Sequence, residues 1–143
     1  YRSPDIIYKI PFNEKIDIWS AGCIMYEILE NKPLFKANTD NNIMVSIHEV
    51  LGQPDENYKN SDINIIMFYQ FFVNKDRYKR IIIPKNLAIK LDKYINIDIL
   101  KANQEDLILK ELFKLIYKCL EYDPFKRIHS FDALKYIDEN IFK

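Results

Sequence analysis

The feature that most constrains the fold is an apolar stretch between positions 15 and 29. Between positions 16 and 29 its only charged side chains are Asp17 and Glu27, and the apolar residues go nearly all the way round a helical wheel. A helix that is apolar on every side belongs in the interior of a domain, and about fifteen residues are too few to span a membrane. We therefore predict a buried central helix over residues of about 15–30.

Asp17 is the informative residue of this stretch. A carboxylate inside a hydrophobic core is tolerated only when it is hydrogen-bonded or paired with a cation. We therefore expect Asp17 to lie in the core with partners for its carboxylate, rather than to be a simple surface acid.

Length and composition indicate one domain with a real core. The chain has 143 residues, of which 48% are hydrophobic, and this excludes a disordered tail. Its 21 Lys and Arg residues balance 21 Asp and Glu residues, so no net charge attracts nucleic acid or an anionic membrane, and neither is expected as a partner. The sequence shows no targeting segment and uses few cysteines, which predicts an intracellular protein of the cytoplasm or nucleus.

The residues that commonly bind metals or phosphate are poorly placed for that role. Cys23 and Cys119 could form a disulfide or half of a metal site, but their apolar surroundings favour two buried thiols. His48 and His129 lie far apart without ligand spacing, which favours surface or cap-adjacent imidazoles. With only two glycines, the chain has no Gly-rich phosphate loop. We therefore expect neither a metal site nor a cofactor site in this chain.

Helical periodicity recurs in three further segments. After Asp40, a candidate N-cap, apolar residues recur at helical spacing until Gly52 ends the pattern. A second amphipathic pattern runs from Glu105 to Leu120, and a third follows Ser130, its candidate N-cap. Because no repeat and no clear strand interrupts these helices, the predicted fold class is mostly α.

The segment 55–103 is long, irregular and apolar, as expected of an insertion packed on a helical body. Its residues 81–83 are β-branched and precede Pro84, which indicates a short extended piece, and a short helix could follow. Basic and aromatic side chains gather at 75–80 and could bind nucleic acid or an acidic partner motif. A solvated loop face of a Lys-rich protein is the interpretation that we favour.

Three motifs resemble landmarks of the eukaryotic protein kinases, in family order and at about family spacing: Arg2-Ser-Pro-Asp5, Asp17-x-Trp19-Ser20-x-Gly22-Cys23 and Asp123-Pro124-x-x-Arg127. They are similar, in turn, to the Ala-Pro-Glu motif that closes the activation segment, to the start of the F helix, and to the turn before the last C-lobe helices. The resemblance implies a partial protein kinase domain over residues 1–143, which is the lower part of a kinase-like C-lobe.

Further features resemble the CMGC group, which includes cyclin-dependent, MAP, glycogen-synthase and DYRK-type kinases. They are Tyr1-Arg2, Trp19-Ser-Ala-Gly-Cys23, Pro33-Leu-Phe35, Val50-Leu-Gly-Gln-Pro54 and the insertion at 55–103. In that group the insertion is often a docking surface. The resemblance therefore implies a docking partner or regulatory subunit at 55–103, with the apolar run 65–72 partly in the interface.

The resemblance also implies structural support of the active site by four residues. Asp5 matches a glutamate that forms a buried ion pair with the arginine matching Arg127. Asp5 is one methylene shorter, so either the backbone shifts to compensate or the pair is loose. Asp17 matches the aspartate that accepts hydrogen bonds from the catalytic-loop backbone, and Trp19 is implied to be a core anchor.

Tyr1 and Arg2 match the loop that receives the substrate residue after the phosphorylated Ser or Thr, and the arginine is implied to favour proline there. The alternative for Arg2 is a solvated basic residue at a frayed end. The sequence contains no Gly-rich loop, no His-Arg-Asp and no Asp-Phe-Gly. We therefore expect no catalytic residue in this chain, and ATP and Mg²⁺ to bind a longer parent protein.

Our leading hypothesis is a fragment of a Ser/Thr kinase that transfers the ATP γ-phosphoryl to Ser or Thr of a protein substrate, in a proline-directed manner, with the chain itself inactive. A second hypothesis is a non-catalytic pseudokinase or a kinase-derived binding module, toward which Asp5 in place of glutamate points. A third, an unrelated helical adaptor, requires three ordered motif matches to be chance.

Overall fold

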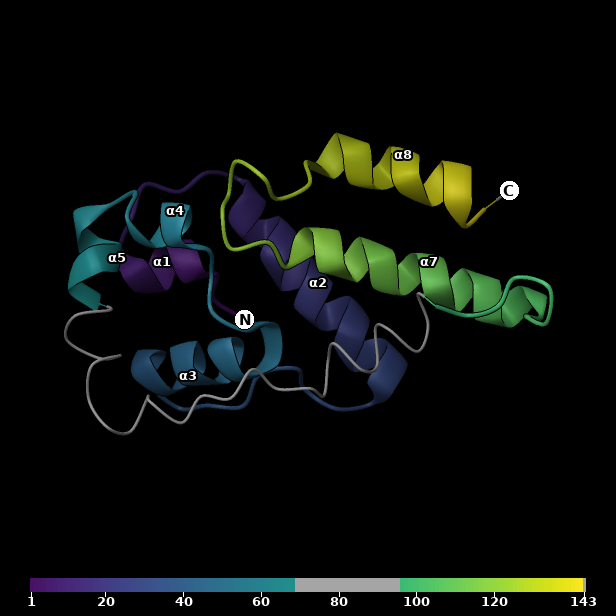
Figure 1. Ribbon diagram of the computed structural model, residues 1–143, viewed down its shortest axis with the longest axis horizontal. Helices are drawn as coiled ribbons and strands as arrows, with labels where there is room; N and C mark the ends of the chain where they lie inside the picture. Colours follow the sequence, from purple (N-terminus) through teal and green to yellow (C-terminus); the bar gives the residue numbers. More distant parts are fainter. Residues whose placement is uncertain (69–95, 143) are drawn as a thin grey trace.

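The computed structural model describes residues 1–68 and 96–142, and the described part is helical with no strand (Figure 1). Its helices are α1 (Pro4–Tyr8), α2 (Lys15–Glu30), α3 (Asp40–Leu51), α4 (Glu56–Lys59), α5 (Ile63–Phe68), α7 (Gln104–Cys119) and α8 (Ser130–Asn140). Figure 1 shows α1, α4 and α5 gathered at one end, whereas α7 and α8 extend side by side toward the other. The predicted mostly α fold class is confirmed.

The main helix pair of the core is α2 with α7. The buried face of α2 carries Trp19, Gly22, Cys23 and Tyr26. The ring of Tyr26 meets Phe113 of α7 edge to face, with 6.5 Å between the centroids. Burial of this face against α7 accounts for the apolar residues from which an interior helix is predicted here.

The opposite face of α2 is exposed, which corrects the prediction of a helix buried on every side. Asp17, Ala21, Ile24 and Ile28 are all exposed, and Ile28 is 74% exposed. At about 100° per residue, these positions lie on the side of the helix away from the α7 contact. The sequence marks both faces as apolar, but among the described residues only one of them is covered.

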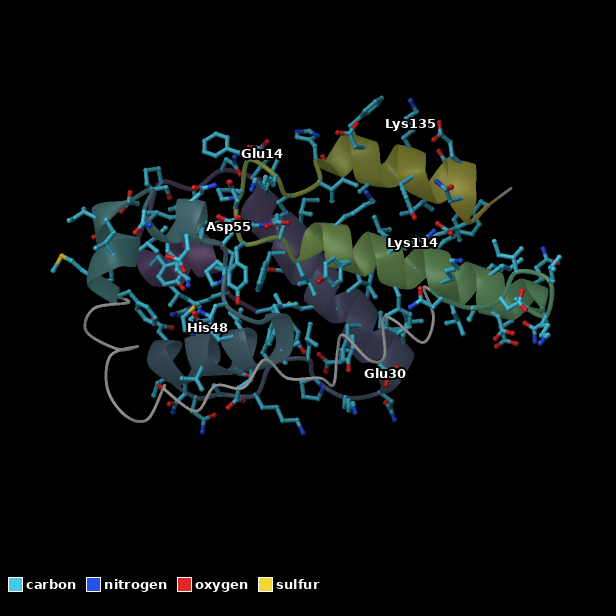
Figure 2. All side chains as sticks on the ribbon, viewed as in Figure 1. Glu14, Glu30, His48, Asp55, Lys114 and Lys135 are labelled. Atoms are coloured by element: carbon cyan, nitrogen blue, oxygen red, sulfur yellow. The ribbon has the colours of Figure 1, made fainter. Side chains whose placement is uncertain are left out.

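A cluster of aromatic residues joins α1, α3 and α5. The Tyr8 ring meets Phe68 edge to face at 4.9 Å, and its hydroxyl lies 3.1 Å from Nε2 of His48. His48 is in the last turn of α3, close to its C-cap, yet it is buried in the interior beside α1 (Figure 2). The expectation of a surface imidazole is therefore wrong for this residue, because the aromatic cluster encloses it.

The helix caps lie one residue from the predicted positions. Thr39, not Asp40, caps α3 by accepting the N–H of Asn42. His129, not Ser130, caps α8 through Nδ1, which accepts the N–H of Phe131. Gly52 ends α3 as predicted, with a positive φ of 78°. Such shifts arise because several polar residues in a row can each supply a capping oxygen or nitrogen.

Other sequence-based expectations have mixed outcomes. Cys23 and Cys119 are free and buried, which confirms the interpretation as two buried thiols. The extended piece at 81–83, the helix after Pro84 and the basic patch at 75–80 lie outside the described residues. In the described part of the chain, none of the helices combines the length and apolarity needed to cross a bilayer.

Replacing Gly22 by alanine should destabilise the fold. A Cβ at this position would lie 2.7 Å from Cβ of Cys119, so α2 and α7 would have to move apart. We expect a loss of about 1–3 kcal/mol from overpacking, offset in part by about 1 kcal/mol of helix propensity. Urea unfolding measures the change, and Ala21→Ser on the exposed face is the control. Unchanged or greater stability of Gly22→Ala would contradict the close approach of the helices.

The buried imidazole should make the fold sensitive to mild acid. Burial, with a smaller contribution from the charge of Lys59, lowers the pKa of His48 to about 4. In the unfolded chain the imidazole binds a proton at its ordinary pKa of about 6.5. The stability that the neutral, buried His48 contributes to the fold is therefore fully present above about pH 6.5 and is lost as the pH falls toward 4. Between pH 7 and pH 5 we expect a loss of about 2 kcal/mol from this group.

Unfolding free energies of the wild-type chain and of His48→Phe at the two pH values test this prediction. The change in unfolding free energy between about pH 7 and pH 5 should be smaller in His48→Phe than in the wild type. His129→Gln keeps the buried imidazole of His48 and should show the wild-type change. Equal pH dependence in His48→Phe and the wild type would contradict the assignment to His48.

Candidate functional site

The side chain at the centre of the site is Arg127, which the loop between α7 and α8 directs inward. Asp123 shapes this loop, because its carbonyl accepts the N–H groups of Lys126 and Arg127. The carboxylate of Asp123 accepts the N–H of Phe125 at 2.9 Å, as in a side-chain-closed turn. The turn places the Arg127 side chain in the interior, with no exposed surface.

All five N–H donors of the Arg127 guanidinium have an acceptor. Nη1 and Nη2 donate to the two carboxylate oxygens of Asp5, each at 2.9 Å. The other three hydrogen bonds go to backbone carbonyls: Nε to Glu121 at 2.9 Å, Nη1 to Lys15 at 3.0 Å and Nη2 to Tyr122 at 3.1 Å. One side chain thereby connects α1, the start of α2 and the end of the α7 segment.

The Asp5–Arg127 pair is close and bidentate, so the shorter acidic side chain does not leave it loose. Neither side chain of the pair is exposed. Taking two charges out of water is costly, and the cost is repaid only with good geometry and satisfied donors. Both conditions hold here. Loss of either partner would leave an uncompensated buried charge.

Trp19 contacts the guanidinium from α2. The Arg127 Cζ lies 5.4 Å from the centroid of the Trp19 ring, within the range of a cation–π interaction. Phe35 stacks nearly parallel with Trp19, at 5.8 Å and 13°. Trp19 is fully buried and therefore lies in the core, where the sequence analysis places it.

The loop of Tyr1 and Arg2 is attached to α2 and α3. Ser20 donates to the Tyr1 carbonyl at 2.9 Å, and the Tyr1 hydroxyl donates to Glu27. Burial and the neighbouring Glu27 carboxylate raise the pKa of Tyr1 to about 12. Arg2 pairs with Asp40 at 2.9 Å, but both side chains are more than half exposed, so this pair contributes little stability.

Two surface hollows flank this loop. One, of about 300 Å³, is lined by Tyr1, Arg2, Ser3, Ile6, Ile16, Asp17 and Ser20. The other, of about 250 Å³, is lined by Tyr1, Arg2, Pro33, Phe35, Ala37 and Ile43. The structure thus brings Tyr1, Arg2 and Asp17 to one hollow. The remaining site residues of the sequence analysis, Asp5, Trp19 and Arg127, meet in the buried network.

Asp17 is exposed, which corrects the expectation that it lies inside the core. The physical reason is its position on the uncovered face of α2. Asp17 lines the hollow together with Ser20 and the Tyr1–Arg2 loop.

Sequence reasoning missed the residues that hold the Tyr1–Arg2 loop. Ser20 belongs to the motif that begins at Asp17, but nothing in this motif indicates that its hydroxyl donates to the Tyr1 carbonyl. Glu27 and Asp40 are distant in sequence from Tyr1 and Arg2, and no pattern joins them. Only the fold brings these groups together.

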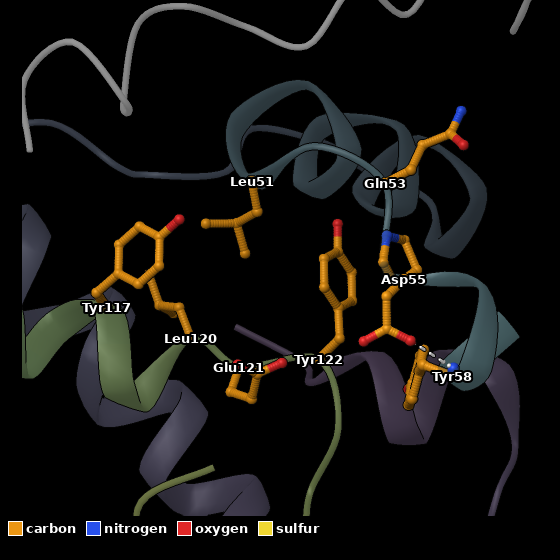
Figure 3. Close-up of a pocket in the computed structure, with 9 residues that line it drawn as sticks. Leu51, Gln53, Asp55, Tyr58, Tyr117, Leu120, Glu121 and Tyr122 are labelled. Atoms are coloured by element: carbon orange, nitrogen blue, oxygen red, sulfur yellow. Dashed lines mark hydrogen bonds between the residues drawn. The ribbon is translucent and has the colours of Figure 1, made fainter. Parts of the chain in front are cut away.

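The start of the 55–103 segment is fixed to the body by the turn between α3 and α4, which forms a pocket of about 170 Å³ against the end of α7 (Figure 3). Tyr122 donates its hydroxyl to the Gly52 carbonyl. The carboxylate of Asp55 accepts the N–H of Tyr58 at 2.8 Å, and this bond, helped by Lys126, lowers the pKa of Asp55.

Residues 1–68 and 96–142 contain no group of three or more His, Cys, Asp or Glu side chains that could hold a metal ion.

Comparison with known proteins gives a consistent result. Residues 1–137 match the model of the protein kinase domain. The chain is 28% identical over 147 residues to serine/threonine-protein kinase prp4 of Schizosaccharomyces pombe, 33% over 138 residues to mitogen-activated protein kinase HOG1 of Blumeria graminis, and 27% over 135 residues to cyclin-dependent kinase 4 of Xenopus laevis.

These alignments cover 95%, 94% and 94% of this chain, respectively, but only 31%, 32% and 35% of the three relatives. The chain therefore spans about one third of the length of these proteins.

Arg127→Ala should strongly destabilise the chain, because it leaves the Asp5 carboxylate buried without its partner. We expect a loss of about 3–5 kcal/mol in the free energy of unfolding. The control is Lys126→Ala, which removes an exposed pair with Asp55 at 3.4 Å and should cost about 1 kcal/mol or less. Chemical unfolding of both variants provides the comparison, and similar small losses would contradict the central role of Arg127.

Proposed function

This chain belongs to the protein kinase family, in the CMGC group of Ser/Thr kinases, and we propose that it forms the lower part of the C-lobe of a longer, proline-directed enzyme. The match to the kinase domain over residues 1–137 supports the assignment. The observation that carries the proposal is the attachment of the Tyr1–Arg2 loop to α2 through Ser20, directly ahead of the buried Asp5–Arg127 pair.

The longer enzyme would transfer the γ-phosphoryl of ATP to a Ser or Thr hydroxyl of a protein substrate. Bound ATP and Mg²⁺ would supply the phosphoryl group and the cation that stabilises its charge. The residues of this chain do not fit these groups, since the sequence has no Gly-rich loop, His-Arg-Asp or Asp-Phe-Gly. We therefore assign this chain no step in the chemistry.

The contribution of the chain is to hold the substrate-side loop. Ser20 fixes the Tyr1 backbone, while the guanidinium of Arg2 stays more than half exposed at the edge of both hollows. A substrate with proline after the phosphorylated residue would lie against this loop. Asp5 follows Arg2 by three positions, so the Arg127 network restrains the loop from its C-terminal side.

Asp17 would act from the neighbouring face. Its exposed carboxylate lines the same hollow as Arg2, and we assign it the acceptance of backbone hydrogen bonds from the catalytic loop of the longer enzyme. Such bonds would position that loop, so Asp17 is a positioning residue and not a catalytic one.

A non-catalytic binding module is the second proposal. It is favoured by the attachment of the start of the 55–103 segment to the body of the domain: Tyr122 holds the Gly52 carbonyl just ahead of it, and Asp55 caps α4. In this case a docking partner or regulatory subunit would bind at 55–103, with or without phosphoryl transfer by a longer protein.

Phosphorylation assays test the proposed function. The purified 143-residue chain should transfer no phosphate from ATP to a Ser-Pro peptide, and transfer by the chain alone would contradict the proposal. A longer protein that carries this chain should prefer a Ser-Pro peptide to its Ser-Ala match. Arg2→Ala should lower the ratio of the two kcat/KM values by about tenfold, equivalent to about 1.4 kcal/mol.

The control for Arg2→Ala is Lys36→Ala, which removes another exposed cation and should leave the ratio unchanged. An unchanged ratio in Arg2→Ala would remove the specificity role of Arg2. A longer protein that binds partners but transfers no phosphate would favour the binding module.

A further inference from the structure

A cavity of about 530 Å³ lies where three connecting segments meet, and it is larger than the hollows beside Tyr1 and Arg2. The segment after α1, the region from α4 to the start of α5, and the α7–α8 loop each form one wall. Because α4 and α5 belong to the 55–103 segment, this cavity joins that segment to the body of the domain.

The cavity has an apolar wall and an uncovered aromatic rim. Ile10, Pro11, Tyr58 and Pro124 line it. Phe125, which also lines it, is 88% exposed. The apolar lining and the exposed Phe125 ring together form one continuous apolar surface, and such a surface is typical of an interaction site.

The charges around the cavity are unevenly compensated. Lys126, which lines the cavity, pairs with Asp55 at 3.4 Å, and Lys59, which follows the lining residue Tyr58 in the sequence, pairs with Glu56 at 2.7 Å.

Two carboxylates that line the cavity, those of Asp62 and Asp123, form no salt bridge with any of the residues that the structure describes. Each uses Oδ1 to accept a backbone N–H two residues further on, at 2.8 Å from Asn64 and 2.9 Å from Phe125. Their Oδ2 atoms remain for an external donor. The cavity therefore combines an apolar interior with negative charge at its edge.

We propose that this cavity docks a segment of a partner protein that inserts an apolar side chain and flanks it with Lys or Arg. The apolar side chain would occupy the cavity, and the cations would contact Asp62 and Asp123 and lie against the Phe125 ring. A nucleic acid or an acidic peptide would be repelled by the same carboxylates. This inference rests on the docking role proposed for 55–103, and it is independent of phosphoryl transfer.

Fluorescence anisotropy with labelled synthetic peptides tests the proposal on the purified 143-residue chain. The probe carries Leu-Phe between Lys and Arg. One comparison peptide has Gln in place of both cations, and a second has Ser in place of Leu and Phe. We expect saturable binding of the probe, with a Kd at least about tenfold higher for each comparison peptide.

Variants of the chain locate the binding site. Asp62→Asn with Asp123→Asn keeps the oxygens that close both turns but removes the charges, and should raise the Kd of the probe about tenfold. Phe125→Ser should weaken binding to a similar degree. The matched controls are Asp98→Asn and Leu100→Ser, an Asp that closes the same kind of turn and an exposed apolar residue elsewhere.

Absence of probe binding, equal binding of the Gln peptide, or unchanged affinity of the Asp62/Asp123 and Phe125 variants would each overturn the proposal. Binding that ignores the cations would instead indicate an apolar pocket without charge selection. Because the readout is direct binding without ATP, its failure is distinct from a failure of the longer protein to phosphorylate Ser-Pro peptides.

Discussion

The rest of the structure depends on the buried fork between Asp5 and Arg127, which lie 122 positions apart in the sequence. Burying two charges is favourable only when the geometry is good and every donor is satisfied. Here the carboxylate takes two of the five N–H groups and backbone carbonyls take the others. The arrangement leaves little freedom in how the first helix, the start of α2 and the last loop are placed relative to one another.

Helix α2 links this buried fork to the surface. Its inner face supplies Trp19 to the guanidinium and packs so closely on α7 that only a glycine fits at position 22. Its outer part holds the Tyr1 carbonyl through Ser20. One helix therefore connects core packing with the substrate-side loop, and this connection supports the proposed role of the chain within a kinase C-lobe.

Helical periodicity is a local signal and was sufficient to predict α2, α3, α7 and α8, whereas the short helices α4 and α5 were not predicted. The Asp5–Arg127 pair was implied by the resemblance to kinases and by no local pattern of the chain. Sequence reasoning misplaced Asp17 and His48, whose exposure depends on which neighbours cover them. An apolar stretch shows that a face can be buried, but not that another segment covers it. The contacts of Arg2 with Asp40 and of Arg127 with three carbonyls carried no signal, since distant pairs and backbone acceptors leave no pattern.

A double-mutant cycle on Asp5→Asn and Arg127→Met measures the central claim most directly, because the coupling free energy isolates the pair from the effects of each single change. The account predicts a coupling of at least about 2 kcal/mol, well above that of an exposed pair. A coupling of about 0.5 kcal/mol or less would show that the buried fork is no stronger than a surface ion pair, and would contradict its place at the centre of the fold.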